Sequence, residues 1–220
     1  MAPAGLRALK ATGRWRPKNK ANAGPWWHSL MVSTITASIR LEVDARDDLG
    51  FISQADILER ADTELSCPVT FTDPLTGKRM TKCLKPDALI GLEYKTKSGS
   101  RFRFYVVEAD RGTEPLTSRN PNRKSILQNF AQYQAYISSG VYKQHLKLTS
   151  PLLVLNVTAD MKRTGSMLKV AQSLSPPPPY IFFETATKYP VCSGSRFAHL
   201  KFLEAEWRGV SDRAHRPGRS

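Results

Sequence analysis

Apolar and polar residues recur with different periods along the chain, and these periods predict where helices and strands lie. Between Trp26 and about Asp44 apolar residues recur every three or four positions, which predicts a helix. The segment Ser53–Asp56 has the form of a capping box, in which a serine side chain accepts a hydrogen bond from a backbone N–H three residues on. It therefore predicts a short second helix that ends near Arg60.

Strand-like segments follow in the middle of the chain. Val69–Thr72 and Met80–Leu84 flank a loop that contains proline and glycine, and Asp87–Tyr94 comes next. Arg101–Glu108 begins with alternating basic and aromatic residues and ends in an apolar run, which is typical of a strand with a buried end. We expect these strands to form a meander.

Helices and strands alternate in the second half. A polar loop at 111–122 precedes a predicted helix that is capped by Asn122 or a neighbour and runs to about Ser138. The remaining predicted elements are strands at 152–157 and 180–184, a helix at 158–174, and either a strand or a helix at 200–207. This order predicts an α/β fold with a mixed β-sheet flanked by helices.

Charge changes this picture at the two ends of the chain. The 220 residues carry 33 Lys and Arg against 19 Asp and Glu, a net charge of +14. Residues 1–23 contain six basic residues and no acidic one, and residues 208–220 contain four Arg and one Asp. We therefore predict a basic disordered arm (1–23), one α/β domain (24–207) and a basic disordered tail (208–220).

The positive excess favours a polyanionic partner, with nucleic acid first and an anionic membrane surface second. The arm fits binding along DNA phosphates and, equally, a solvated tail that aids solubility. No apolar run is long enough to span a membrane, and no secretory signal is recognisable. Three widely spaced cysteines favour a reducing compartment. We expect a cytoplasmic protein with DNA as its partner and no membrane association.

Three carboxylates stand at the ends of predicted strands. Asp87 opens one strand, and Glu108 and Asp110 close another with the spacing that places both on one face. If the strands are neighbours, the three side chains meet at one edge of the sheet and form a site for Mg²⁺ or Mn²⁺. Such an ion supports attack on a phosphodiester. The alternative is that these are ordinary strand-end residues that contact Arg111, Arg123 or solvent.

Two motifs give the sequence a resemblance to a known family. They are Lys85-Pro-Asp-Ala-Leu-Ile90 and Tyr105-Val-Val-Glu-Ala-Asp-Arg-Gly-Thr-Glu-Pro115. Together with the segments around Tyr133, Gly140–Tyr142 and Pro151–Thr158, the chain from about Trp26 to Trp207 resembles the replication-relaxation family of plasmid and phage replication or mobilisation proteins. That family is related to relaxases of the PD-(D/E)xK, restriction-endonuclease-like type.

The resemblance implies a restriction-endonuclease-like mixed sheet in which Asp87 and Glu108 bind a divalent metal. At the position where a nuclease would carry lysine the chain has Asp110, so a basic group from the following segment is needed. Lys124 and Arg123 are the first candidates, and Arg111 is the third. The winged-helix region of many family members has no counterpart here beyond the short basic arm.

Three other residue types have a structural and a functional interpretation. His28 suits either a packed or capping role or a catalytic one, and the former is favoured. Tyr133 is a conceivable nucleophile, but it falls on an apolar helix face, which favours core packing. Cys67 and Cys83 lack partners at zinc spacing and are predicted to be free thiols.

The sequence thus predicts a DNA-binding protein of plasmid or phage replication or mobilisation that nicks DNA with Mg²⁺ or Mn²⁺. Asp87 and Glu108 hold the metal, Asp110 assists as ligand or base, and Lys124 stabilises charge. Replication or mobilisation proteins are further expected partners. The alternative is a catalytically inactive accessory factor on a nuclease-like fold, and a third is a structural module that docks on nucleic acid through its basic tails.

Overall fold

A computed structural model describes residues 26–186, 201–211 and 214–219. The predicted arm, 1–23, lies outside these residues. The helices are α2 (Trp26–Asp44), α3 (Gln54–Ala61), α4 (Ile126–Ser138), α5 (Val141–His145) and α6 (Met161–Gln172). The strands are β1 (Leu49–Ile52), β2 (Cys67–Thr72), β3 (Arg79–Leu84), β4 (Ala88–Thr96), β5 (Gly99–Asp110), β6 (Leu152–Thr158), β7 (Ile181–Thr185), β8 (Trp207–Gly209) and β9 (Ala214–His215).

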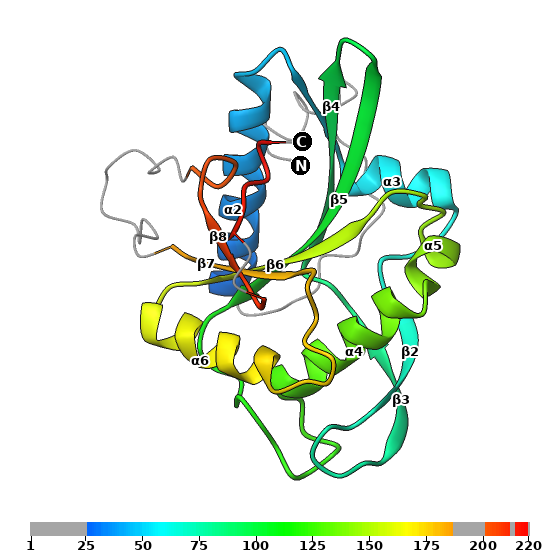
Figure 1. Cartoon of the computed structure of the whole chain (residues 1–220), viewed down its shortest axis with the longest axis vertical. Helices are drawn as coiled ribbons and strands as arrows, with labels where there is room; N and C mark the ends of the chain where they lie inside the picture. The colour runs from blue at the N-terminus through cyan, green and yellow to red at the C-terminus, as the bar shows by residue number, and fades with distance from the viewer. Residues whose placement is uncertain (1–25, 187–200, 212–213, 220) are drawn as a thin grey trace, which may run out of the picture.

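Seven of these strands form one mixed sheet in the order β1-β4-β5-β6-β7-β8-β9 (Figure 1). β4 and β5 pair antiparallel, whereas β6 is parallel to both β5 and β7. The predicted α/β class with a mixed sheet and flanking helices is confirmed. The predicted meander is wrong in one respect, because β2 and β3 form a separate two-stranded sheet.

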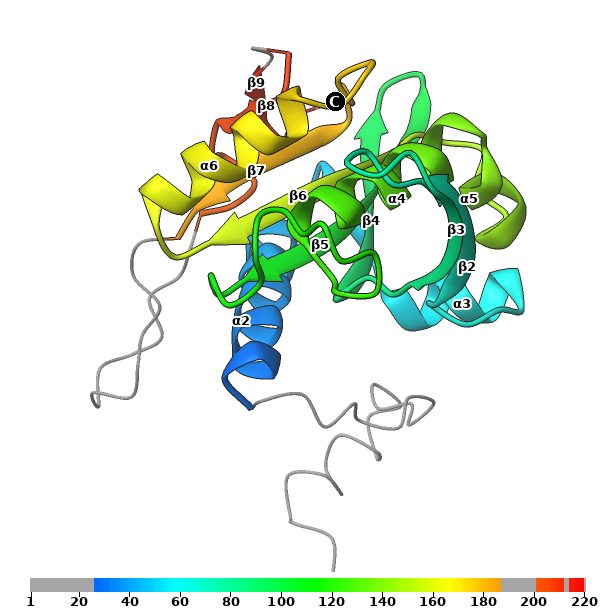
Figure 2. The same ribbon diagram turned by 90° about the horizontal axis from the view of Figure 1, so that it is seen from below.

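Helices cover both faces of the large sheet (Figure 2). Alternate residues of β5 serve two cores: Phe104 and Val106 pack with α4 and α6, whereas Tyr105 and Val107 pack with α2. This alternation follows from the period of two along a strand. It explains why β5 is apolar over its buried half, because each of its faces lies under a helix.

Local caps set the helix boundaries. The capping-box prediction at Ser53 is confirmed, because its side chain accepts a hydrogen bond from Asp56 N and α3 begins at the next residue. α4 is capped by Ser125, which accepts from Gln128 N, so the cap lies three residues beyond Asn122. The long loop before α4 is consequently extended to Ser125.

The C-terminal residues belong to the folded domain, although an unstructured tail was predicted from residue 208. Trp207 is fully buried, and the chain after it forms β8 and β9 at the edge of the sheet. Glu42 of α2 accepts hydrogen bonds from the backbone N–H groups of Phe202 and Leu203 at 2.7 and 3.0 Å. The charge count did not predict that the C-terminal segment is folded, because it registers the arginines of the segment and not its buried apolar residues, such as Val210.

Two short elements, β1 and α5, were not predicted from the sequence. Both are only four or five residues long, which is too short for a periodic pattern to show. Among the residues described, no helix is long and apolar enough to cross a membrane.

Candidate active site

The antiparallel pairing of β4 with β5 brings Asp87 beside Glu108. Ala88 is opposite Val107, so the residue before β4 lies next to the end of β5. The backbone N–H of Ala109 donates to Oδ2 of Asp87 at 2.9 Å. Asp87 therefore lies next to the end of β5 that carries Glu108, at one edge of the sheet.

A cavity of about 240 Å³ opens at this edge. Its walls come from the start of α2, the end of β5, the loop that follows, and α4. The lining includes His28, Asp87, Glu108, Asp110, Arg111, Lys124, Asn129 and Asn156. All four residues predicted to take part in catalysis thus border one space, together with Arg111. Arg123 is not among the lining residues.

Glu108 is the most perturbed carboxyl group of this cavity. Burial, followed by the negative charge of Asp87, raises its pKa from 4.5 to about 8. The hydroxyl of Tyr133 donates a hydrogen bond to its Oε1. A cation bound beside the two carboxyl groups would offset both effects.

Tyr133 itself is fully buried, as the packing interpretation predicted. Burial, with the charge of Glu108 added, raises the pKa of its hydroxyl well above 10. It is therefore suited to orient Glu108 and not to attack a phosphodiester.

Asp110 is engaged in a different interaction from the one predicted. Nε and Nη2 of Arg163, in α6, lie 2.7 and 3.2 Å from its carboxylate oxygens; Asp110 is buried and Arg163 is partly buried. Arg163 also donates from Nη2 to the backbone carbonyl of Glu114 at 2.7 Å. Among the described residues no three Asp, Glu, His or Cys side chains are grouped as a metal site, so Asp110 does not join Asp87 and Glu108 as the predicted third ligand.

Lys124, like Arg111, is a basic residue that lines the cavity. Its Nζ lies 2.9 Å from Oε1 of Glu114. Burial lowers the pKa of Lys124, but the hydrogen bond and charge of Glu114, helped by Glu108 and Asp87, outweigh it and raise the pKa overall. The ammonium group therefore stays charged beside the two carboxylates.

Two groups of the cavity were not assigned to it from the sequence. His28, for which packing was favoured, donates from Nε2 to Oδ1 of Asp87 at 2.9 Å. Asn129 is buried, and its Oδ1 has no hydrogen-bond partner among the described residues. In the sequence, only the position of His28 near the start of a predicted helix indicated a role in the site. No sequence pattern distinguished Asn129 from the other polar residues of its helix.

The donor set fits a hard divalent cation. Mg²⁺ is held in proteins by one or two carboxylates, with water and substrate oxygens completing the shell. Asp87 and Glu108 would supply the carboxylates, and Asn129 of α4, which lines the same cavity, has an unpartnered amide oxygen.

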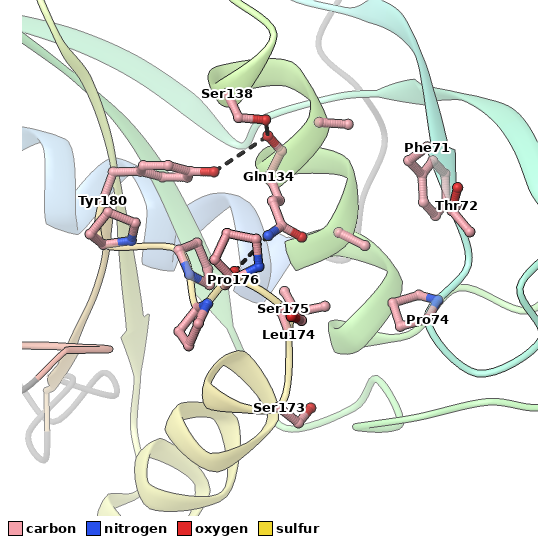
Figure 3. A pocket seen from close by; sticks show the side chains of 15 residues that line it. Phe71, Thr72, Pro74, Gln134, Ser138, Ser173, Leu174, Ser175, Pro176 and Tyr180 are labelled. Carbon is pink, nitrogen blue, oxygen red and sulfur yellow. Dashed lines mark hydrogen bonds between the residues drawn. The ribbon is translucent and has the colours of Figure 1, made fainter.

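A second cavity, of about 710 Å³, has a different character (Figure 3). It lies between the end of β2, α4 and the segment 173–180, and Gln134 crosses it to donate to the carbonyl of Pro176 at 2.6 Å. The described residues that line it are apolar or uncharged, and none is Asp, Glu, Lys, Arg, His or Cys. It therefore lacks the groups needed for acid–base or metal chemistry.

A comparison with family models identifies the family of the chain. The model described as Replication-relaxation matches residues 1–152 of the 220. The chain belongs to the replication-relaxation family. The match contains Asp87, Glu108 and Lys124 and ends at the first residue of β6, so that Arg163 lies beyond it.

Membership of the replication-relaxation family connects the chain with replication or mobilisation. No curated protein and no solved structure matches it. The relationship to PD-(D/E)xK nucleases that the resemblance implied is therefore not confirmed by these comparisons.

Proposed function

We propose that this replication-relaxation protein is a DNA endonuclease that uses Mg²⁺ or Mn²⁺ to nick DNA during plasmid or phage replication or mobilisation. The observation that carries the proposal is the pair Asp87 and Glu108 in one cavity with Lys124. The raised pKa of Glu108 supports it, because perturbed carboxyl groups that line a cavity are typical of functional sites.

In this proposal Asp87 and Glu108 hold the ion. When bound, the ion would polarise the phosphodiester and lower the pKa of a water molecule. His28 and the N–H of Ala109 each bind one oxygen of Asp87, and so fix the plane of its carboxylate. Tyr133 orients Glu108 in the same way.

Lys124 takes the place of the missing motif lysine. Its ammonium group lies beside the carboxylate pair and would stabilise the negative charge that develops on the phosphate. Asp110, predicted as a ligand or base, has a positioning role through Arg163, which also holds the backbone at Glu114. The loop that carries Lys124 is thereby attached to α6.

The test is nicking of supercoiled plasmid with Mg²⁺ by the wild type, Asp87→Asn and Glu108→Gln. We expect both variants to lose at least 100-fold in rate, because each removes one of two ligand charges. Asp47→Asn is the matched control, since it removes an exposed carboxylate from the turn after α2. Nicking by Asp87→Asn at the wild-type rate would contradict the assignment.

A second candidate is a catalytically inactive DNA-binding accessory factor. It is favoured by one observation, the engagement of Asp110 with Arg163 at the position where a nuclease carries a free lysine. This candidate function predicts that the protein binds DNA in a salt-sensitive way and does not nick it with either Mg²⁺ or Mn²⁺.

A further inference from the structure

The loop between β5 and α4 concentrates exposed positive charge beside the cavity. Residues 111–125 contain four exposed basic side chains, at Arg111, Arg119, Arg123 and Lys124. Their one acidic residue, Glu114, is already paired with Lys124. Two of the four, Arg111 and Lys124, line the cavity itself, so the charge extends from the loop surface to the carboxylates.

The loop is held in place at both ends. Near its start Arg163 binds Asp110 and the carbonyl of Glu114. Towards its end Lys82 of β3 donates to the carbonyl of Pro121 and, at 2.9 Å, to Oε1 of Gln128 in α4. Two backbone hydrogen bonds, from Ile126 N and Leu127 N to the carbonyls of residues 115 and 116, join it to the first turn of α4. Its cations are thus carried on a fixed surface.

The composition of the loop suits the sugar–phosphate backbone. Residues 117–125 read Thr-Ser-Arg-Asn-Pro-Asn-Arg-Lys-Ser, in which every residue except the proline has a side-chain donor. Arg, Lys, Ser, Thr and Asn side chains provide most protein contacts to DNA phosphates and sugars. The sheet β2–β3, which Lys82 ties to the loop, adds exposed Lys78, Arg79 and Lys85.

Acidic residues gather elsewhere. None occurs between Glu114 and Asp160, whereas eight lie in the segment 42–64. That segment runs from the upper end of α2 to α3 in Figure 1, away from the loop at the bottom. The loop, and the cavity that it helps to line, therefore lie away from this acidic segment, where a polyanion meets less repulsion.

We propose that the loop 111–125, together with β2–β3, binds the DNA backbone and directs a phosphodiester into the cavity at Asp87 and Glu108. The inference deepens the proposed function and rests on it for the choice of DNA as the polyanion. It assigns to the folded domain a role that the net charge had placed in the arm and the tail. Contacts of this kind bind DNA irrespective of its sequence.

The test compares two double variants that each remove two exposed charges. Arg119→Gln/Arg123→Gln changes the loop, and Lys97→Gln/Arg101→Gln changes the turn between β4 and β5. Lys97 lies in this turn and Arg101 near the start of β5, seven residues from Glu108 and roughly 23 Å away at about 3.3 Å per residue. The readout is the Kd for a 30-base-pair duplex in EDTA at several salt concentrations.

Each lost phosphate contact lowers the slope of log K against log salt by about 0.9. We expect the loop variant to lower the slope by about 1.8 and the control variant to leave it within error. An unchanged slope in the loop variant, an equal fall in the control, or no DNA binding by the wild type would overturn the proposal.

The outcome is separable from that of the nuclease assignment. A fall in slope without any nicking by the wild type supports the DNA-binding surface and contradicts the nuclease. Nicking that depends on Asp87, with an unchanged slope in the loop variant, supports the nuclease and contradicts the surface.

Discussion

His28 and Asp87 are joined by a hydrogen bond of 2.9 Å between Nε2 and Oδ1, although 59 residues separate them. The imidazole comes from the first turn of α2, and the carboxylate stands immediately before β4. Since the N–H of Ala109 binds the other oxygen, both oxygens of Asp87 have a donor. A carboxylate held in this way presents its remaining lone pairs in a fixed direction.

His28→Ala is expected to reduce the rate of metal-dependent nicking by about 10- to 100-fold, because groups that orient a metal ligand contribute about that much. His28→Gln keeps a side-chain donor and is expected to recover part of the loss. The side chains of His28 and Asp87 are both partly exposed, so we expect the substitution at His28 to change the free energy of unfolding by less than about 1 kcal/mol. The measurement is kcat and KM for nicking beside a urea titration. Equal loss in Ala and Gln variants would contradict an orienting role.

Asp87→Asn and Glu108→Gln are expected to abolish stabilisation of the fold by Mg²⁺. A ligand that binds only the folded state at 100 times its Kd raises the free energy of unfolding by about 2.7 kcal/mol. We expect the wild type and Asp47→Asn to show such a rise in thermal midpoint when Mg²⁺ replaces EDTA. This readout is independent of catalysis. An equal rise in all four proteins would place the ion elsewhere.

Glu108 is expected to make the metal-free protein less stable as the pH rises. Burial raises its folded pKa to about 8, above the usual 4.5. Between these pH values the unfolded state releases the proton first, so the free energy of unfolding falls with rising pH and levels off above about 8. The total is on the order of a few kcal/mol.

Glu108→Gln cannot ionise and should remove this fall. Urea titrations in EDTA at pH 5, 7 and 9 measure the free energy of unfolding. We expect Glu108→Gln to become more stable relative to the wild type at pH 7 and 9 than at pH 5. Parallel pH profiles of the two proteins would show that the pKa of Glu108 is not raised.

Arg163→Met is expected to destabilise the domain by about 3–5 kcal/mol, because it leaves the buried carboxylate of Asp110 without its partner. The double variant Asp110→Leu/Arg163→Met removes both charges and should recover most of the loss. Urea unfolding of the two single variants and the double variant measures their coupling. Additive losses would mean that the pair does not act as a unit.

The fold could be predicted where local pattern determines structure. α2 has the predicted ends, since its apolar face repeats without interruption, and the antiparallel strands place Asp87 beside Glu108 as their spacing indicated. The side chains that contact the site residues from distant parts of the chain could not be predicted. Arg163 reaches Asp110 from 53 residues away, and no sequence period connects a side chain of α6 to the end of β5.

The same reasoning explains the tail. Strand β8 is three residues long and is stabilised by Trp207 and by pairing with β7, both of which are tertiary effects. Net charge reports the exposed arginines of a segment and carries no information about what its apolar residues contact.

The central position of β6 has a consequence for the newly made chain. This strand pairs in parallel with β5, with Asn156 opposite Glu108, and a parallel pair forms only after its long connection has been synthesised. A nascent protein that ends before α6 contains Asp87, Glu108 and Lys124, with His28 and Tyr133, but lacks Arg163, which binds Asp110 and the carbonyl of Glu114. The loop that carries Lys124 therefore gains its attachment to α6 only after residue 163 has been synthesised.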